Sequence, residues 1–117
     1  MTDEEIVALF QGLDGEGPSQ EDEGRAWAAF EDAVGDRIRL TCEYTMRRAG
    51  HAEEADDMVQ KTRMKLVKDR YRALRSFRLG EAKMTTWVTR IATNSCNEWL
   101  RSRNKPVWQR EQKDDER

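Results

Sequence analysis

The chain has 117 residues with a net charge of −2, and 38% of its residues are charged while 37% are hydrophobic. This length allows one domain with a single core. No apolar run reaches the roughly 20 residues that a membrane-spanning helix needs, and the acidic start at Met1–Glu5 lacks the basic and apolar regions of a secretory signal. We therefore expect a cytoplasmic protein that does not associate with a membrane.

The charges are divided unevenly along the chain. Residues 1–35 contain ten acids and one base, whereas residues 61–110 contain fourteen bases and three acids. A field polarised in this way favours a polyanion such as nucleic acid at the second half, and the first half would repel it.

Cysteine and histidine are too sparse to indicate a metal site. Cys42 and Cys96 are isolated, and His51 is the only histidine, so neither a zinc site nor a disulfide framework is expected. We interpret both thiols as small buried side chains. The lone histidine and scattered carboxylates also provide no paired acid and base, which argues against an enzyme and against any catalytic residue or cofactor.

The spacing of apolar residues predicts an all-α fold, a compact bundle of three to four helices. Residues 1–24 are expected to form a short helix, from Asp3 to Gly12 with Thr2 or Asp3 as its N-cap, followed by a flexible acidic linker over residues 13–24. The bundle itself should occupy residues 25–104. Residues 105–117 are expected to be a flexible tail or the start of a linker.

A long core helix is predicted from Arg25 to Ala49. We expect a bend or break at Gly35 and a left-handed stop at Gly50. The last part of the apolar face should be widened by Leu40 and Tyr44. The face itself consists of Trp27, Phe30, Val34, Ile38, Cys42 and Ala49.

A third helix is predicted from Ala52 to about Leu74, opened by acids that favour the positive end of the helix dipole. From Lys65 onward it becomes basic, and a connection over residues 75–82 follows. Its expected inward residues are Ala55, Met58 or Val59, Thr62, Leu66 and Val67.

The fourth helix, over residues 83–103, has two different faces. One is an apolar stripe for the core, formed by Trp87, Val88, Ile91, Ala92, Ser95 and Trp99. The opposite face presents guanidinium and amide groups suited to phosphates and base edges, which are Arg90, Asn94, Asn97, Arg101 and Arg103. Most helices of this kind are ordinary surface helices, so this pattern alone does not decide between a solvated face and a nucleic-acid interface.

Three sequence blocks together resemble a known family. The blocks are Ala55-Asp56-Asp57-Met58-Val59-Gln60-Lys61-Thr62, Ser76-Phe77-Arg78 and Trp87-Val88-Thr89-Arg90-Ile91-Ala92-Thr93-Asn94. Their order and internal spacing resemble region two of bacterial sigma factors of the extracytoplasmic-function group, and the resemblance covers roughly residues 26–103.

The resemblance implies a helical transcription-initiation domain with two macromolecular partners. One is the RNA polymerase core, contacted at the clamp helices of its largest subunit, and the other is promoter DNA, read as the single-stranded minus-10 element. A further partner would be an anti-sigma factor, and the free protein would be a monomer. The residues implied at the polymerase are Asp57, Gln60, Lys61, Arg63 and Met64.

In the family, the connection between the third and fourth helices captures a flipped base, which corresponds here to residues 77–84. The DNA-binding residues implied in and after this loop are Phe77, Arg78, Lys83, Met84, Arg90, Asn94, Asn97, Arg101 and Arg103. Trp87 is interpreted as a core residue rather than as a stacking platform, because it opens the apolar stripe.

The sequence departs from the family pattern at the expected polymerase surface. Lys61 stands where the family usually has glutamate, and Arg63 where it has a large aromatic residue. Nothing after Arg103 resembles the usual second domain that reads the minus-35 element. The alternative interpretation is a one-domain sigma mimic or regulator that binds polymerase or an anti-sigma partner without reading DNA.

Overall fold

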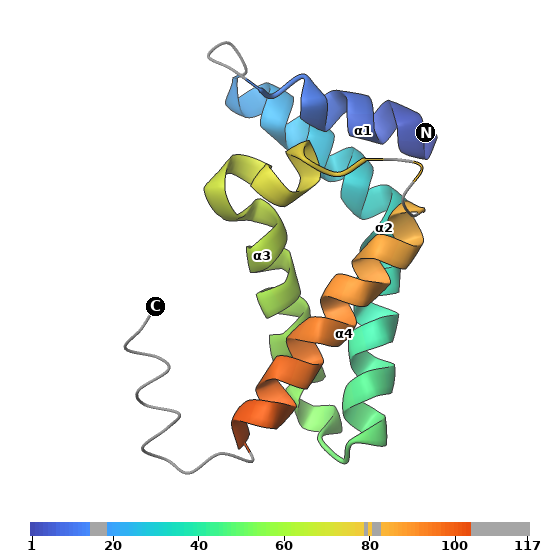
Figure 1. Ribbon diagram of the computed structural model, residues 1–117, viewed down its shortest axis with the longest axis vertical. Helices are drawn as coiled ribbons and strands as arrows, with labels where there is room; N and C mark the ends of the chain where they lie inside the picture. The colour runs from blue at the N-terminus through green and yellow to red at the C-terminus, as the bar shows by residue number, and fades with distance from the viewer. Residues whose placement is uncertain (15–18, 79, 81–82, 104–117) are drawn as a thin grey trace.

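The computed structural model describes residues 1–14, 19–78, 80 and 83–103. In chain order its helices are α1 (Asp3–Gln11), α2 (Gln20–Arg48), the short 3-10 helix η1 (Ala52–Glu54), α3 (Ala55–Arg75) and α4 (Met84–Arg103) (Figure 1). The predicted all-α bundle is therefore confirmed. None of the helices in the described ranges has the length and apolar character needed to cross a membrane. The predicted tail over residues 105–117 lies outside the described residues.

Helix α1 forms where the sequence predicts it. The Thr2 hydroxyl accepts from the Glu5 backbone N–H and the Glu5 carboxylate accepts from the Thr2 N–H, at 3.2 and 3.1 Å. This reciprocal capping box satisfies two N–H groups that the first helical turn would otherwise leave unpaired. Ile6 and Phe10 are fully buried. A helix this short is marginal alone, so tertiary packing must hold it.

Helix α2 begins at Gln20, five residues before its predicted start. The reason is a second capping box, in which Ser19 and Asp22 bond reciprocally. Residues 20–24 are therefore helical, and the prediction that they belong to the linker is wrong. Gly15 to Pro18, the middle of that predicted linker, lie outside the described residues.

Gly35, where we expected a bend or a break, does not break α2, which is one helix from Gln20 to Arg48. A Cβ atom at this position would lie 2.5 Å from Oε2 of Glu31. That carboxylate is held by Arg63 of α3, whose Nε and Nη2 donate to its two oxygens at 2.8 and 3.1 Å. Glycine therefore leaves room for an ion pair between α2 and α3. Gly50 adopts φ +81°, which confirms the left-handed stop.

The core lies along one face of α2. Its fully or almost fully buried hydrophobic residues recur at four-residue steps and are Ala26, Phe30, Val34, Ile38, Cys42 and Met46. Leu40 and Tyr44 are 57% and 59% exposed, so the prediction that they widen this face is wrong. Both lie two residues from positions of the buried series, which places them on the opposite side of the helix. The Tyr44 hydroxyl accepts from Arg48 at 2.8 Å.

The two cysteines are buried in the core, as predicted. Cys42 on α2 lies 3.9 Å from the Thr62 hydroxyl, which donates to the Met58 carbonyl at 2.8 Å. A hydrogen bond with the Cys42 thiol, together with burial, raises the pKa of the Cys96 thiol. Cys96 is therefore a protonated packing residue rather than a reactive thiolate.

Helix α3 is not the single straight helix that the sequence predicts. It packs Met58, Val59, Thr62 and Leu66 inward, but Val67 is 39% exposed. Three consecutive residues, Asp69 to Tyr71, then adopt left-handed backbone angles with φ between 53° and 62°. We call Lys68–Tyr71 the left-handed turn. Each such residue costs about 1 to 2 kcal/mol, so the surrounding structure must stabilise the turn.

Two groups stabilise the left-handed turn. The Arg75 guanidinium donates to the carbonyls of Asp69 and Arg70 at 3.0 and 2.8 Å. The Tyr71 ring lies 5.7 Å from both Phe10 of α1 and Trp27 of α2, measured between centroids. Backbone bonding and aromatic packing thus offset the strain.

Helix α4 crosses α2 and runs beside α3, and its first turn lies near α1 (Figure 1). The Met84 backbone N–H donates to Oδ2 of Asp3 at 3.3 Å. Asp3 therefore satisfies an N–H group at the positive end of α4. The first helix of the chain thus helps to fix the start of the last.

The Glu31–Arg63 pair predicts different effects for alanine at two glycines of α2. Gly24→Ala should raise the free energy of unfolding by about 0.8 to 1 kcal/mol, because a Cβ there meets nothing within 4 Å. Gly35→Ala should give almost no net gain, because Glu31 must move and the ion pair, worth up to about 1 kcal/mol, is disturbed. Urea denaturation followed by circular dichroism measures both.

The control is the same Gly35→Ala change in a Glu31→Ala background. There the collision is absent, so alanine should stabilise the protein as much as it does at position 24. If Gly35→Ala in the unaltered protein already matches Gly24→Ala, the ion pair does not explain the glycine.

Candidate nucleic-acid and polymerase interfaces

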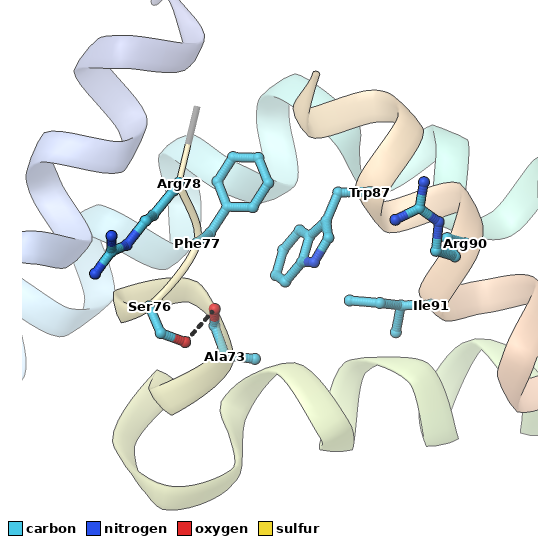
Figure 2. Close-up of a pocket in the computed structure, with 7 residues that line it drawn as sticks. All are labelled: Ala73, Ser76, Phe77, Arg78, Trp87, Arg90 and Ile91. Carbon is cyan, nitrogen blue, oxygen red and sulfur yellow. Dashed lines mark hydrogen bonds between the residues drawn. The ribbon is translucent and has the colours of Figure 1, made fainter. Parts of the chain in front are cut away.

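A pocket of about 370 Å³ lies where the end of α3 meets the first turns of α4 (Figure 2). This is near the small end of the range for ligand pockets. Two aromatic rings and two guanidinium groups dominate its lining. The lining residues are Ala73, Ser76, Phe77, Arg78, Trp87, Arg90 and Ile91.

An aromatic pair forms one wall of the pocket. The ring centroids of Phe77 and Trp87 are 4.7 Å apart, with an angle of 38° between the rings. Phe77 is only 7% exposed, while Trp87 is half-buried. Trp87 packs against the core, as predicted, but it also borders the pocket. The half-buried Trp87 ring, supported by Phe77, offers an aromatic surface of the kind on which a nucleobase stacks.

The polar groups of the pocket are mostly cationic. Figure 2 shows Arg78 and Arg90 at opposite ends of the labelled cluster, with the aromatic pair between them. Both arginines are exposed. The Ser76 hydroxyl already donates to the backbone, at 2.9 Å from the Arg72 carbonyl and 3.3 Å from that of Ala73. The arginines therefore supply the charge that would attract phosphate.

The outer face of α4 continues from the pocket as the sequence predicts. Arg90, Asn94 and Arg101 are exposed and Asn97 is half-buried. The Arg103 guanidinium lies 4.9 Å from the centroid of the Trp99 ring. The opposite stripe is buried or half-buried throughout, which confirms it as the core side of the helix. Arg103 lies against Trp99 of that stripe, so its predicted place on the opposite face is wrong.

The residues predicted in the connection from α3 to α4 differ in their exposure to solvent. Lys83 is exposed. The resemblance implied that Met84 contacts DNA. The Met84 side chain is instead fully buried and belongs to the core. Its place as the first residue of α4, next to Val88 in the apolar series, accounts for this burial. Leu79, Glu81 and Ala82 lie outside the described residues.

The predicted polymerase residues fall on two sides of α3. Asp57, Gln60, Lys61 and Met64 are exposed, and Met64 is 67% exposed. Arg63 instead points towards α2, where it pairs with Glu31, and only 29% of its side-chain surface is accessible. The outer face of α3, defined by Asp57, Gln60, Lys61 and Met64, therefore excludes Arg63.

Several pocket residues were not among the predicted site residues. Ala73, Ser76 and Ile91 contribute to the lining, and Trp87 was assigned to the core alone. A signal for this pocket does exist in the sequence, since aromatic residues stand at both ends of the connection from α3 to α4. Across the described residues, no cluster of three or more His, Cys, Asp or Glu side chains is placed to hold a metal ion.

Comparison with known families agrees with this geometry. The family model for sigma-70 region 2 matches residues 33–105, which is more than half of the chain. Comparisons with curated proteins and with solved structures found no significant match. The matched segment contains most of α2, all of α3 and α4, and the pocket between them. The chain therefore belongs to the sigma-70 region 2 family of non-enzymatic transcription initiation factor domains.

Proposed function

We propose that the domain binds the clamp helices of the RNA polymerase largest subunit through the outer face of α3 and holds an unpaired base of the minus-10 element in the pocket. The pocket is the observation that carries the proposal, because it joins a stacking surface to two arginines. These are the two chemistries that recognition of a single strand requires. The protein would act in the cytoplasm, as a monomer before it joins polymerase.

The energetics of base capture are close to balanced. Extruding a base from a duplex costs a few kcal/mol, while stacking on an aromatic side chain returns about 1 to 3 kcal/mol. The Phe77 and Trp87 rings are already in contact, with centroids 4.7 Å apart and a tilt of 38°, before a base arrives, so little ordering remains to be done in the pocket. Binding to polymerase would supply the remaining free energy for strand opening.

The strand would continue from the pocket along the outer face of α4. Arg90, Asn94, Asn97 and Arg101 succeed one another at three- and four-residue steps, which keeps them on one side of the helix. Guanidinium groups suit phosphate oxygens, and asparagine amides suit base edges. This face therefore suits a DNA strand whose phosphates contact the arginines and whose bases contact the asparagines.

The polymerase contact would be a line along α3. Asp57, Gln60 and Met64 are spaced by three and four residues and are all exposed. An exposed methionine is an adaptable apolar anchor, and the polar residues around it would fix orientation. Arg63 has a structural role in this proposal, because Glu31 already engages it. An anti-sigma factor would compete for the same face.

The first prediction concerns promoter binding. Arg90→Ala combined with Asn94→Ala should weaken binding of the polymerase complex to a forked minus-10 duplex by about tenfold or more, since each lost contact is worth about 1 to 3 kcal/mol. Fluorescence anisotropy with the fork and with a scrambled fork measures both affinity and sequence preference. Polymerase affinity should be unchanged.

The matched control is Arg47→Ala, which removes the same charge from an exposed residue in the last turn of α2, an element that contributes no residue to the pocket. It should have little effect on fork binding. Equal losses from both variants would mean that only net charge matters. Equal binding of fork and scrambled fork by the unaltered protein would favour the alternative, a regulator that binds polymerase without reading DNA.

The second prediction concerns polymerase. Gln60→Ala combined with Met64→Ala should weaken binding to core polymerase at least fivefold, which corresponds to about 1 kcal/mol for a contact residue at the centre of an interface. Arg63→Ala should leave this affinity unchanged while lowering the stability of the domain. Biolayer interferometry with immobilised polymerase, paired with thermal unfolding, separates the two effects. The reverse pattern would show that polymerase binds the α2 side of α3.

A further inference from the structure

The left-handed turn and the residue after it carry exposed cations directly before the pocket. Lys68 and Arg70 of the turn and Arg72 after it are all exposed, and the next residue, Ala73, is the first that lines the pocket. No residue of this turn is among those implied to contact DNA by the family resemblance. The turn is therefore a separate basic surface adjoining the proposed base-binding site.

Arg70 is held by an acid from another part of the chain. Its Nε donates to Oε1 of Glu23, in the first turn of α2, at 3.0 Å. Glu23 is the more buried partner, with 22% of its side-chain surface accessible against 56% for Arg70. A guanidinium has five N–H donors, and within the described residues Nε is the only one of them that Arg70 uses. The other four N–H donors of Arg70 therefore have no partner within the described residues.

The turn does not need the Arg70 side chain for its shape. Arg75 bonds the carbonyls of Asp69 and Arg70, and its Nη1 donates to Oδ1 of Asp14 at 2.7 Å. Tyr71 packs between aromatic rings of α1 and α2. Burial, and secondly the Glu23 carboxylate, raise the pKa of the Tyr71 hydroxyl, as expected for a ring enclosed at this junction. Arg70 is therefore free to exchange its partner while the turn stays in place.

We propose that Arg70 is a phosphate-binding residue for single-stranded DNA and that Glu23 occupies it in the free protein, so that binding exchanges a carboxylate for a phosphate. The proposal rests on the proposed DNA-binding function. A carboxylate and a phosphate both match the geometry of the guanidinium fork. When Arg70 neutralises a DNA phosphate, a counterion is also released from the DNA, and this gain is absent when Arg70 pairs with the Glu23 carboxylate. Glu23 would thus act as an internal competitor that lowers affinity for nucleic acid until polymerase presents the strand.

The experiment compares two glutamates of one helix. Glu23→Gln and Glu21→Gln remove the same charge, but Glu21 is exposed and has no ion-pair partner among the described residues. Binding of the full chain to single-stranded oligodeoxythymidine is measured by anisotropy across a salt series. Glu23→Gln should raise affinity about two- to fivefold above Glu21→Gln, within the strength of an exposed ion pair.

The second step repeats both changes in an Arg70→Ala background. Arg70→Ala alone should weaken binding and reduce the salt slope by about 0.7, the value for one phosphate contact on a single strand. In that background, Glu23→Gln and Glu21→Gln should be equivalent. Circular dichroism checks that each variant is folded.

The outcomes separate this proposal from the proposed function. Equal effects of Glu23→Gln and Glu21→Gln in the unaltered protein, an Arg70→Ala variant with full affinity, or no binding of oligodeoxythymidine at low salt would each overturn it. If Arg90→Ala with Asn94→Ala still weakens fork binding in that case, the pocket proposal stands and only the role of Arg70 fails.

Discussion

The apolar stripe of α2 is the constraint on which the other helices depend. Its members recur every four residues, and four residues turn an α-helix about 40° past a full circle, so the stripe winds around the helix as it advances. Near its start, Phe30 and Trp27 meet Phe10 of α1 and Tyr71 of α3. Further along, Cys42 meets Thr62 of α3 and Cys96 of α4. Because one winding stripe fixes all three partners, the end of α3 and the start of α4 converge, and their convergence creates the pocket.

Much of this fold follows from local sequence chemistry. The two faces of α4 and the stop at Gly50 are set by periodicity and by a backbone angle that glycine tolerates, so the sequence predicts them. The left-handed turn could not be predicted, because Asp69, Arg70 and Tyr71 include neither glycine nor proline. Its stability comes from Arg75 and from rings on other helices. The room that Gly35 leaves for the Glu31–Arg63 ion pair likewise involves an arginine 28 positions away in the chain, which helix propensities alone cannot predict.

In the candidate site, too, some features follow from the local sequence and others depend on contacts between helices. Exposure of Arg90 and Asn94 follows from their position opposite the apolar stripe, and it could be predicted. Aromatic residues at both ends of the connection from α3 to α4 are a signal in the sequence. The pocket itself could not be predicted, since it requires the Phe77 and Trp87 ring centroids to come within 4.7 Å of each other. The pairing of Arg63 with Glu31 of α2 is also a tertiary effect. A family resemblance assigns roles by position, whereas packing decides which of those side chains reach the surface.

The bond between Asp3 and the Met84 backbone joins residues 81 positions apart. Within this domain, α1 is synthesised before Tyr71 of α3 and Met84 of α4, which both contact it. At about 5 to 20 residues per second, Ile6 and Phe10 remain without their full packing for several seconds. The nascent chain of this small domain therefore exposes its first apolar residues to the ribosome surface and to chaperones before the bundle can close.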